Sequence, residues 1–292
     1  MDYIRRCLLF MPGDSMRKIT KGSQTNVDTV IMDLEFGVIL DRKDEGRQIV
    51  AQALSNLDFG HTERLIRLNP PSTSICFDDL DKTIEQHPEG YVISRVEISA
   101  DIQKVDRYLS QAESDRSWLP NSICLLALIE TPLGLINIRE IAQSCSRLDT
   151  LIFGGESFAS YIGAEHSKEG LEILFARSTV VTAAAAYSLH AIDGVFTNLN
   201  DSIGLEEESI FARRLGFTGK LAIHPNQVEI IQNVFTPYQT EIEQAKRLIE
   251  TYEAHQKEGP SIFEFGGKVV DMPMVQSAKH ILNRAQTARL SK

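Results

Sequence analysis

Eight short apolar segments recur along the 292-residue chain, and most are separated by stretches with the spacing of amphipathic helices. Buried parallel strands form continuous apolar runs, because helices cover the sheet. The helical pattern is clear in 41–57, where Ile49, Val50, Ala53 and Leu54 share one face. Alternating strand and helix signals predict a parallel sheet, and eight repeats favour a closed (β/α)8 barrel. The predicted strands are 8–13, 29–35, 65–69, 91–97, 123–130, 150–156, 191–198 and 220–225.

Two further helical patterns, at 205–215 and 241–255, extend the predicted barrel over residues 1–258. No G-x-G-x-x-G follows the first strand, which argues against an open dinucleotide-binding sheet. The remaining segment, 259–292, is too small to fold alone. We therefore expect it to act as a lid or an oligomerisation segment that packs on the barrel or on a neighbouring subunit.

Bulk properties exclude several classes of partner. The net charge is −10, whereas a nucleic-acid-binding surface is basic. No run approaches the roughly 20 apolar residues of a membrane helix, and the apolar run at 7–12 is too short for a secretion signal. The four cysteines lack metal-site spacing, which favours reduced thiols. These features predict a cytoplasmic protein with no nucleic-acid or membrane partner.

Polar and charged residues gather where the predicted strands end. Core strands avoid charge, so one such residue means little, but several at the same end predict the mouth of a barrel, where active sites lie. A network of structural ion pairs at the mouth is the alternative. The strand-end residues are Pro12-Gly13, Asp33-Leu34-Glu35, Arg67-Leu68-Asn69, Arg95-Val96-Glu97, Glu130-Thr131, Glu156-Ser157, Thr197-Asn198 and His224-Pro225.

These residue types suit chemistry on a small acid. Carboxylates on one rim favour Mg²⁺, and Arg67 matches a substrate carboxylate with a bidentate fork. A cation and an arginine together neutralise an oxoacid or hydroxyacid, and the cation stabilises an enolate. These features predict carbon–carbon bond chemistry of the aldol or Claisen type. Phosphate-loop and serine-hydrolase motifs are absent from the sequence, and the middle strands end in no lysine for a Schiff base.

The ordered set of motifs resembles that of the HpcH/HpaI aldolase and citrate lyase β-subunit family. The resemblance spans about residues 5–285, and each motif is weak alone while the ordered set is specific. The matching segments are RCLLFMPG (6–13), DLE (33–35), RLN (67–69), IET (129–131), FGGE (153–156), AIDGVFT (191–197), GKLAIHP (219–225), VFTP (234–237) and VDMP (270–273).

The resemblance implies a Mg²⁺-dependent barrel that cleaves or forms carbon–carbon bonds in CoA or acyl-carrier thioesters, assembled as a homo-oligomer, often a trimer or hexamer. It implies that Arg67 holds the substrate carboxylate and that Glu130 binds the metal directly. Glu35 would lie by the metal through a water molecule. Asp271 would be the acid/base, offered from the C-terminal segment to a neighbouring subunit.

Further expected contacts follow from the same motifs. Pro12, Gly13 and Arg95 are expected to bind the substrate or the cofactor, and Lys18 is expected to approach the phosphates of the cofactor. Glu156 and Ser157 are expected at the metal together with Glu130.

Three positions depart from the family pattern. The second metal carboxylate is replaced by Ser157, a carboxylate of the second strand end by Phe36, and a lysine by Arg95. Serine brings no charge to a Mg²⁺ site, and phenylalanine makes the rim less polar, which suits a methyl-bearing substrate. Fold alone does not guarantee activity, so the departures also allow a protein without the family reaction.

Three hypotheses stay open at this point. The first is a lyase that cleaves citramalyl-CoA or malyl-CoA to acetyl-CoA and a 2-oxoacid, with citramalyl-CoA slightly favoured by Phe36. The second is a citrate lyase β subunit acting on an acyl-carrier thioester. The third is a non-catalytic or ligand-sensing barrel with a degraded metal site.

Overall fold

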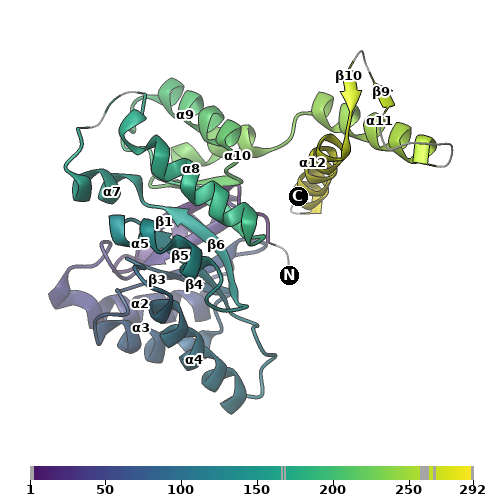
Figure 1. Ribbon diagram of the computed structural model, residues 1–292. Helices are drawn as coiled ribbons and strands as arrows, with labels where there is room; N and C mark the ends of the chain where they lie inside the picture. Colours follow the sequence, from purple (N-terminus) through teal and green to yellow (C-terminus); the bar gives the residue numbers. More distant parts are fainter. Residues whose placement is uncertain (1–2, 166, 168, 257–262, 266–267, 291–292) are drawn as a thin grey trace. The chain divides into compact units, whose positions relative to one another are not determined.

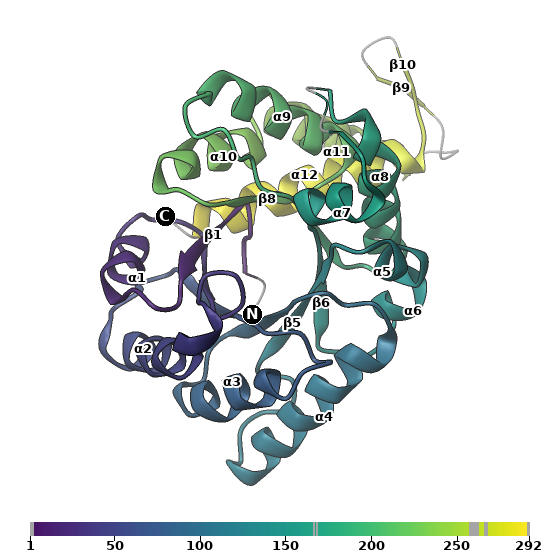
Figure 2. The same cartoon turned by 90° about the vertical axis from the view of Figure 1, so that its left-hand side faces the viewer.

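The computed structural model describes residues 3–165, 167, 169–256, 263–265 and 268–290. The chain divides into two compact units, Arg5–Gln232 and Asn233–Lys292, the latter together with the first residues of the chain. In the larger unit eight parallel strands close into a barrel in sequence order, with β1 paired to β8 (Figure 2). This confirms the predicted fold. The strands are β1 Cys7–Pro12, β2 Thr29–Asp33, β3 Glu63–Leu68, β4 Gly90–Ile93, β5 Cys124–Ile129, β6 Leu148–Phe153, β7 His190–Asp193 and β8 Gly219–Ala222.

Inward-facing aliphatic side chains fill the barrel. Each strand contributes at least one residue to a single buried cluster, as the alternation of strand side chains requires. Such a packed interior leaves the site to the strand ends and the loops that follow them. The cluster is Leu8, Ile31, Leu65, Val92, Leu126, Leu128, Ile152, Ile192 and Leu221.

Helices surround the barrel (Figures 1 and 2), and they carry buried side chains. In α2, for example, Val50, Ala53 and Leu54 are buried, as the periodicity predicted. The helices are α1 Met16–Ser23, α2 Lys43–Asn56, α3 Ile75–Thr83, α4 Ser99–Asp115, α5 Pro132–Ile136, α6 Ile138–Ala142, α7 Gly155–Ile162, α8 Leu171–Ala186, α9 Ser202–Leu215 and α10 Val228–Phe235, with short 3-10 turns η1 Leu40–Arg42, η2 Ile84–Gln86 and η3 Pro225–Gln227.

Ion pairs close the end of the barrel where the strands begin. Arg5 donates to Glu63 from Nε at 2.8 Å and to Asp149 from Nη1 at 2.8 Å. Arg6 donates to Asp28 from Nε at 2.9 Å. Both arginines are buried and ion-paired. We therefore assign this end of the barrel a structural role. All four cysteines are free.

The smaller unit consists of α11 Gln239–Gln256, a two-stranded antiparallel sheet of β9 Phe263–Phe265 and β10 Lys268–Val270, and α12 Met272–Leu290. Helix α11 packs against α12 (Figure 1), and Tyr252, Val270 and Val275 form a small core. The compact units therefore divide after Gln232, whereas the sequence placed the division after residue 258. The pattern of α11 resembles that of a barrel helix, and periodicity does not reveal which partner a helix packs against. In the part of the chain that the structure describes, no helix is long and apolar enough to cross a membrane.

Candidate active site

Arg67 is held at the end of β3 by a buried carboxylate on the neighbouring strand. Its Nε donates to Oδ1 of Asp33 at 2.8 Å, and its Nη2 donates to Oδ2 at 2.6 Å. The parallel register that pairs Asp33 with Arg67 brings the two side chains together. This side of the guanidinium fork is therefore used within the protein, and Nη1 is the nitrogen without a hydrogen bond to Asp33.

The loop after β2 donates two backbone hydrogen bonds to the same carboxylate. The backbone N–H groups of Glu35 and Gly37 donate to Asp33 at 2.8 and 2.7 Å. From the other side, Nζ of buried Lys43 donates to the carbonyls of Leu34 and Glu35 at 2.5 and 2.7 Å. These four bonds fix the backbone that carries Glu35.

Among the described residues, Glu35 is a buried carboxylate with no hydrogen bond of normal geometry, although the Ser94 hydroxyl lies near enough to lower its pKa. Both of its oxygens are inaccessible and unbonded, although Nη1 of Arg67 lies 3.6 Å from Oε2 and Nε of Arg95 lies 3.3 Å from Oε1. Burial raises the pKa of the Glu35 carboxyl; Arg67 opposes this shift and Glu130 adds to it. A buried, orphaned carboxylate is costly unless a ligand completes its coordination.

Glu130 follows β5 and is 2% exposed. Its Oε1 accepts the backbone N–H of Arg95 at 2.9 Å, and Arg95 adopts a left-handed backbone with φ of 49°. Gly154, after β6, passes so close that an added Cβ would lie 2.5 Å from the Cβ of Glu130. Only glycine permits this approach.

A pocket of about 410 Å³ opens over these strand ends. Arg67 and Glu130 line it, together with Glu156 and Ser157 at the start of α7. Glu35 is buried beside the pocket. The full lining is Phe10, Asp33, Phe36, Gly37, Arg67, Leu128, Glu130, Gly154, Gly155, Glu156, Ser157, Val195, Leu221 and Ile223.

The donor set fits Mg²⁺. Glu35 offers two unbonded carboxylate oxygens, and Glu130 lies close enough to influence its pKa. The described residues contain no cluster of three or more histidine, cysteine or carboxylate side chains that could hold a metal. Mg²⁺ commonly uses one or two protein carboxylates and completes its octahedron with water and substrate oxygens, so the smaller set suffices.

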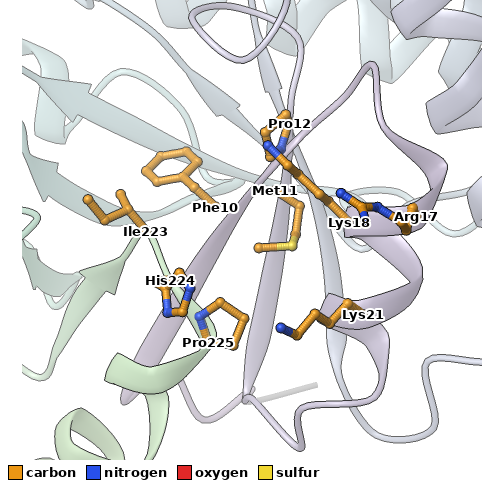
Figure 3. A pocket seen from close by; sticks show the side chains of 9 residues that line it. All are labelled: Phe10, Met11, Pro12, Arg17, Lys18, Lys21, Ile223, His224 and Pro225. Atoms are coloured by element: carbon orange, nitrogen blue, oxygen red, sulfur yellow. The ribbon is translucent and has the colours of Figure 1, made fainter. Parts of the chain in front are cut away.

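A second, basic pocket of about 370 Å³ lies beside the first and shares Phe10 and Ile223 with it. Arg17, Lys18 and Lys21 of α1 line one side, with His224 and Pro225 across from them (Figure 3). This local positive charge contrasts with the net charge of the chain, which is −10. Within the described residues, no ion pair or hydrogen bond engages the side chains of these three cations, so their charge is available to an anion.

The predicted site residues fall into distinct places. Arg67, Glu130, Glu156 and Ser157 line the first pocket. Pro12 and Lys18 line the second.

Other predicted residues lie outside the pockets. Gly13 is buried, and its N–H donates to the carbonyl of Asp33 at 2.9 Å, which gives it a structural role. Arg95 lies against Glu35 and Phe36. Asp271 belongs to the smaller unit, where it precedes α12 and accepts the N–H of Met274 at 3.3 Å.

Sequence reasoning missed two roles. Asp33 was recognised as a strand-end residue without a function, and its register opposite Arg67 was the available signal. Arg17 and Lys21 accompany Lys18 on α1, and their spacing of four residues places them on one side of a helix.

Residues 6–225 match the model of the HpcH/HpaI aldolase/citrate lyase family, and residues 170–288 match that of a C–C bond lyase of the TIM-barrel fold. The chain belongs to the HpcH/HpaI aldolase/citrate lyase family. It is 33% identical to the mitochondrial citramalyl-CoA lyase of Homo sapiens, covering 98% of this chain and 86% of the relative. It is 32% identical to the citrate lyase subunit beta of Haemophilus influenzae, covering 97% and 98%.

A solved structure of this HpcH/HpaI aldolase/citrate lyase type is also similar. Protein CitE from Mycobacterium tuberculosis, in complex with magnesium, acetoacetate and coenzyme A, superposes with a TM-score of 0.77. The two chains share 26% identity, with 96% of this chain and 98% of that chain covered.

Proposed function

We propose that this protein is a Mg²⁺-dependent carbon–carbon lyase that cleaves a 3-hydroxyacyl-CoA of the citramalyl-CoA or malyl-CoA type to acetyl-CoA and a 2-oxoacid. One observation carries the proposal. The orphaned carboxylate of Glu35 lies with Glu130 and Arg67 at a pocket that adjoins a basic pocket. The first suits a metal and a small acid, and the second suits the phosphates of CoA.

Each site residue has a role in this reaction. Arg67 holds the substrate carboxylate through Nη1, because Asp33 occupies Nε and Nη2. Glu130 and Glu35 would hold Mg²⁺ between them, with Glu130 as the proposed main ligand. When bound, the metal polarises the oxygen on C3 and stabilises the charge that develops on cleavage.

The bond changes balance without a co-reactant. A base removes the proton of the C3 hydroxyl, the C2–C3 bond breaks, and C3 becomes the carbonyl carbon of the 2-oxoacid. The electron pair remains on C2 next to the thioester and takes up a proton, which yields acetyl-CoA. Asp271 of another copy is the proposed acid/base, on the strength of the family motif.

CoA is proposed to extend from the first pocket into the second. Phe10 and Ile223 border both pockets, so an acyl group near Arg67 places its thioester arm along them. Arg17, Lys18 and Lys21 then neutralise the phosphates. The related CitE structure with magnesium and coenzyme A supports this use of the fold.

A homo-oligomer, a trimer or hexamer, is the proposed assembly. Exposed apolar residues on α5, α7 and the start of α8 support it; Figure 2 shows where these helices lie. Six large apolar side chains are exposed there, and these helices pack against one another. Exposed apolar surface of this extent marks an interaction site. The residues are Leu133, Ile136, Tyr161, Ile162, Leu171 and Phe175.

A citrate lyase β subunit acting on an acyl-carrier thioester is the second candidate. The 32% identity to the Haemophilus influenzae subunit over nearly both full lengths favours it. The deciding experiment incubates the protein and Mg²⁺ with citramalyl-CoA, malyl-CoA and citryl-CoA, and measures acetyl-CoA and the 2-oxoacid released. Glu130→Gln serves as the inactive control. Absence of cleavage of all three thioesters would reject the CoA lyase.

A further inference from the structure

Phe36 is exposed at the first pocket although it is a large apolar residue. It is 62% exposed and lines the pocket. Two guanidinium groups lie near its ring, whose centroid is 5.2 Å from Cζ of Arg67 and 5.5 Å from Cζ of Arg95. Phe10 lies 4.6 Å from Cζ of Arg67, so two aromatic rings flank the proposed carboxylate anchor.

The charged residues that line the pocket are mostly acidic. Among the described residues that line it, Arg67 is the one cation, whereas Asp33, Glu130 and Glu156 are acidic. Arg95 does not line the pocket and lies against buried Glu35 instead. Leu128, Val195 and Leu221 join the two rings in an apolar wall. The pocket therefore offers one anchor for one carboxylate.

The substituent of a bound 2-oxoacid lies near these rings. It is attached one carbon from the carboxylate, so an acid held on Nη1 of Arg67 carries it within reach of Phe10 or Phe36. An alkyl substituent would gain contact with the ring of Phe36. A second carboxylate would lose hydration there and would meet the carboxylates of Glu130 and Glu156, while the nearest other cation, Arg95, already lies against buried Glu35.

We propose that Phe36 makes this pocket selective for 2-oxoacid units with one carboxylate and an uncharged alkyl substituent, and that it excludes dicarboxylates. This inference rests on the proposed function and narrows its substrate class. It places citramalyl-type thioesters, and those with longer alkyl groups, ahead of citryl thioesters.

The test measures binding, so it is separate from turnover. Wild-type protein with saturating Mg²⁺ is titrated calorimetrically with pyruvate, 2-oxovalerate and 2-oxoglutarate. The last two differ by a terminal methyl against a carboxylate. We expect 2-oxovalerate to bind at least about tenfold more tightly than 2-oxoglutarate, the scale set by small substituents in apolar pockets and by an unpaired charge. Equal affinity, or tighter binding of 2-oxoglutarate, overturns the proposal.

A charged variant provides the second measurement. Phe36→Arg supplies a cation for a second carboxylate and should narrow the difference between the two acids about tenfold. Ile39→Arg adds the same charge in the same loop, at a residue that is 65% exposed and does not line the pocket. It should leave the difference unchanged. An unchanged difference in Phe36→Arg rejects the role of Phe36. If pyruvate does not bind even in the presence of Mg²⁺, the proposed function is rejected, and the selectivity that rests on it is rejected as well.

Discussion

Asp33 accepts two hydrogen bonds from Arg67, of 2.8 and 2.6 Å. The same carboxylate accepts the N–H groups of Glu35 and Gly37. One buried side chain thus orients the proposed substrate anchor and the loop that carries the orphaned carboxylate. Charge-assisted bonds of this kind are strong and directional, so Asp33 acts as a positioning residue for both halves of the site.

Replacement of Asp33 by Asn should test this coupling. The amide places an N–H group toward a donor, either Arg67 or a loop N–H, and removes the counter-charge that is hydrogen-bonded to the guanidinium. We expect the KM for the thioester to rise by a factor that corresponds to about 1–3 kcal/mol, with a loss of about 3–5 kcal/mol in unfolding free energy. Steady-state kinetics and urea unfolding measure the two effects.

The matched control is Asp14→Asn. Asp14 pairs with Arg42 at the partly exposed surface, so its loss should cost at most about 1 kcal/mol and leave KM unchanged. A normal KM in Asp33→Asn would show that Arg67 does not need its partner.

Arg67→Lys tests the anchor itself. Lysine keeps the positive charge but cannot bind Asp33 and a substrate carboxylate at once, because it lacks the planar fork. The expected result is a KM increase equivalent to about 1–3 kcal/mol. Arg64→Lys is the control on the same strand, since Arg64 pairs with Glu89 at the far end of β3. Equal kinetics for the two variants would remove Arg67 from substrate binding.

The sequence predicted the barrel because each strand carries its own apolar run, which is a local signal. It also predicted that Arg67 and Glu130 share one pocket, since all parallel strands end on the same side. The partner of Arg67 was not predictable from composition. Asp33 and Glu35 are both acidic and stand two residues apart, and only the register with β3 shows which one bonds Arg67.

Packing between distant segments cannot be read along the chain. The side chain of Arg95, predicted to bind substrate, also lies against Glu35, a contact between two strand ends, and its role toward the substrate stays a prediction. Helix α11 was assigned to the barrel because its apolar spacing is ordinary, whereas it packs against α12 within the smaller compact unit. Patterns along the chain report that a face is buried and not what buries it.

The raised pKa of Glu35 predicts a pH-dependent metal affinity. The ionised carboxylate attracts the hydrated metal and the protonated one does not. Because burial raises the pKa of Glu35, protons compete at a higher pH than for an exposed glutamate. As pH falls below that pKa, the apparent Kd should rise by about tenfold per pH unit. Calorimetry in two buffers of different ionisation enthalpy measures the proton released. Glu35→Gln should abolish this dependence, and its persistence there would assign it to another group.

The cations of α1 should govern CoA affinity. Lys18→Glu and Lys21→Glu place negative charge in the basic pocket, and each should raise the KM for the thioester about tenfold at low salt. The effect should shrink at high ionic strength, because the side chains are exposed and screened. The control is Lys104→Glu, at an exposed residue of α4, with the same charge change outside both pockets. An unchanged KM in both the Lys18→Glu and the Lys21→Glu variants would place CoA elsewhere.

Ser157 stands where a second metal carboxylate would add charge, which leaves the site with Glu130 and Glu35. Mg²⁺ keeps several waters and binds through few protein carboxylates plus substrate oxygens. We therefore expect weak metal binding to the protein alone and tighter binding with pyruvate. Ser157→Asp should strengthen binding in both conditions. Glu130→Gln should abolish binding and cleavage, because it removes the direct ligand.

Calorimetric Mg²⁺ titration of the wild type and both variants, with and without pyruvate, measures this series. Both variants change the side chain at the pocket with little change in volume, so thermal unfolding should show folded protein in each case. If the wild type binds no metal even with pyruvate, while Ser157→Asp binds it readily, the loss lies in the ligand set and not in the fold. A non-catalytic, ligand-sensing barrel would then account for the site better than a lyase, because the neutral hydroxyl would have removed the charge that the metal needs.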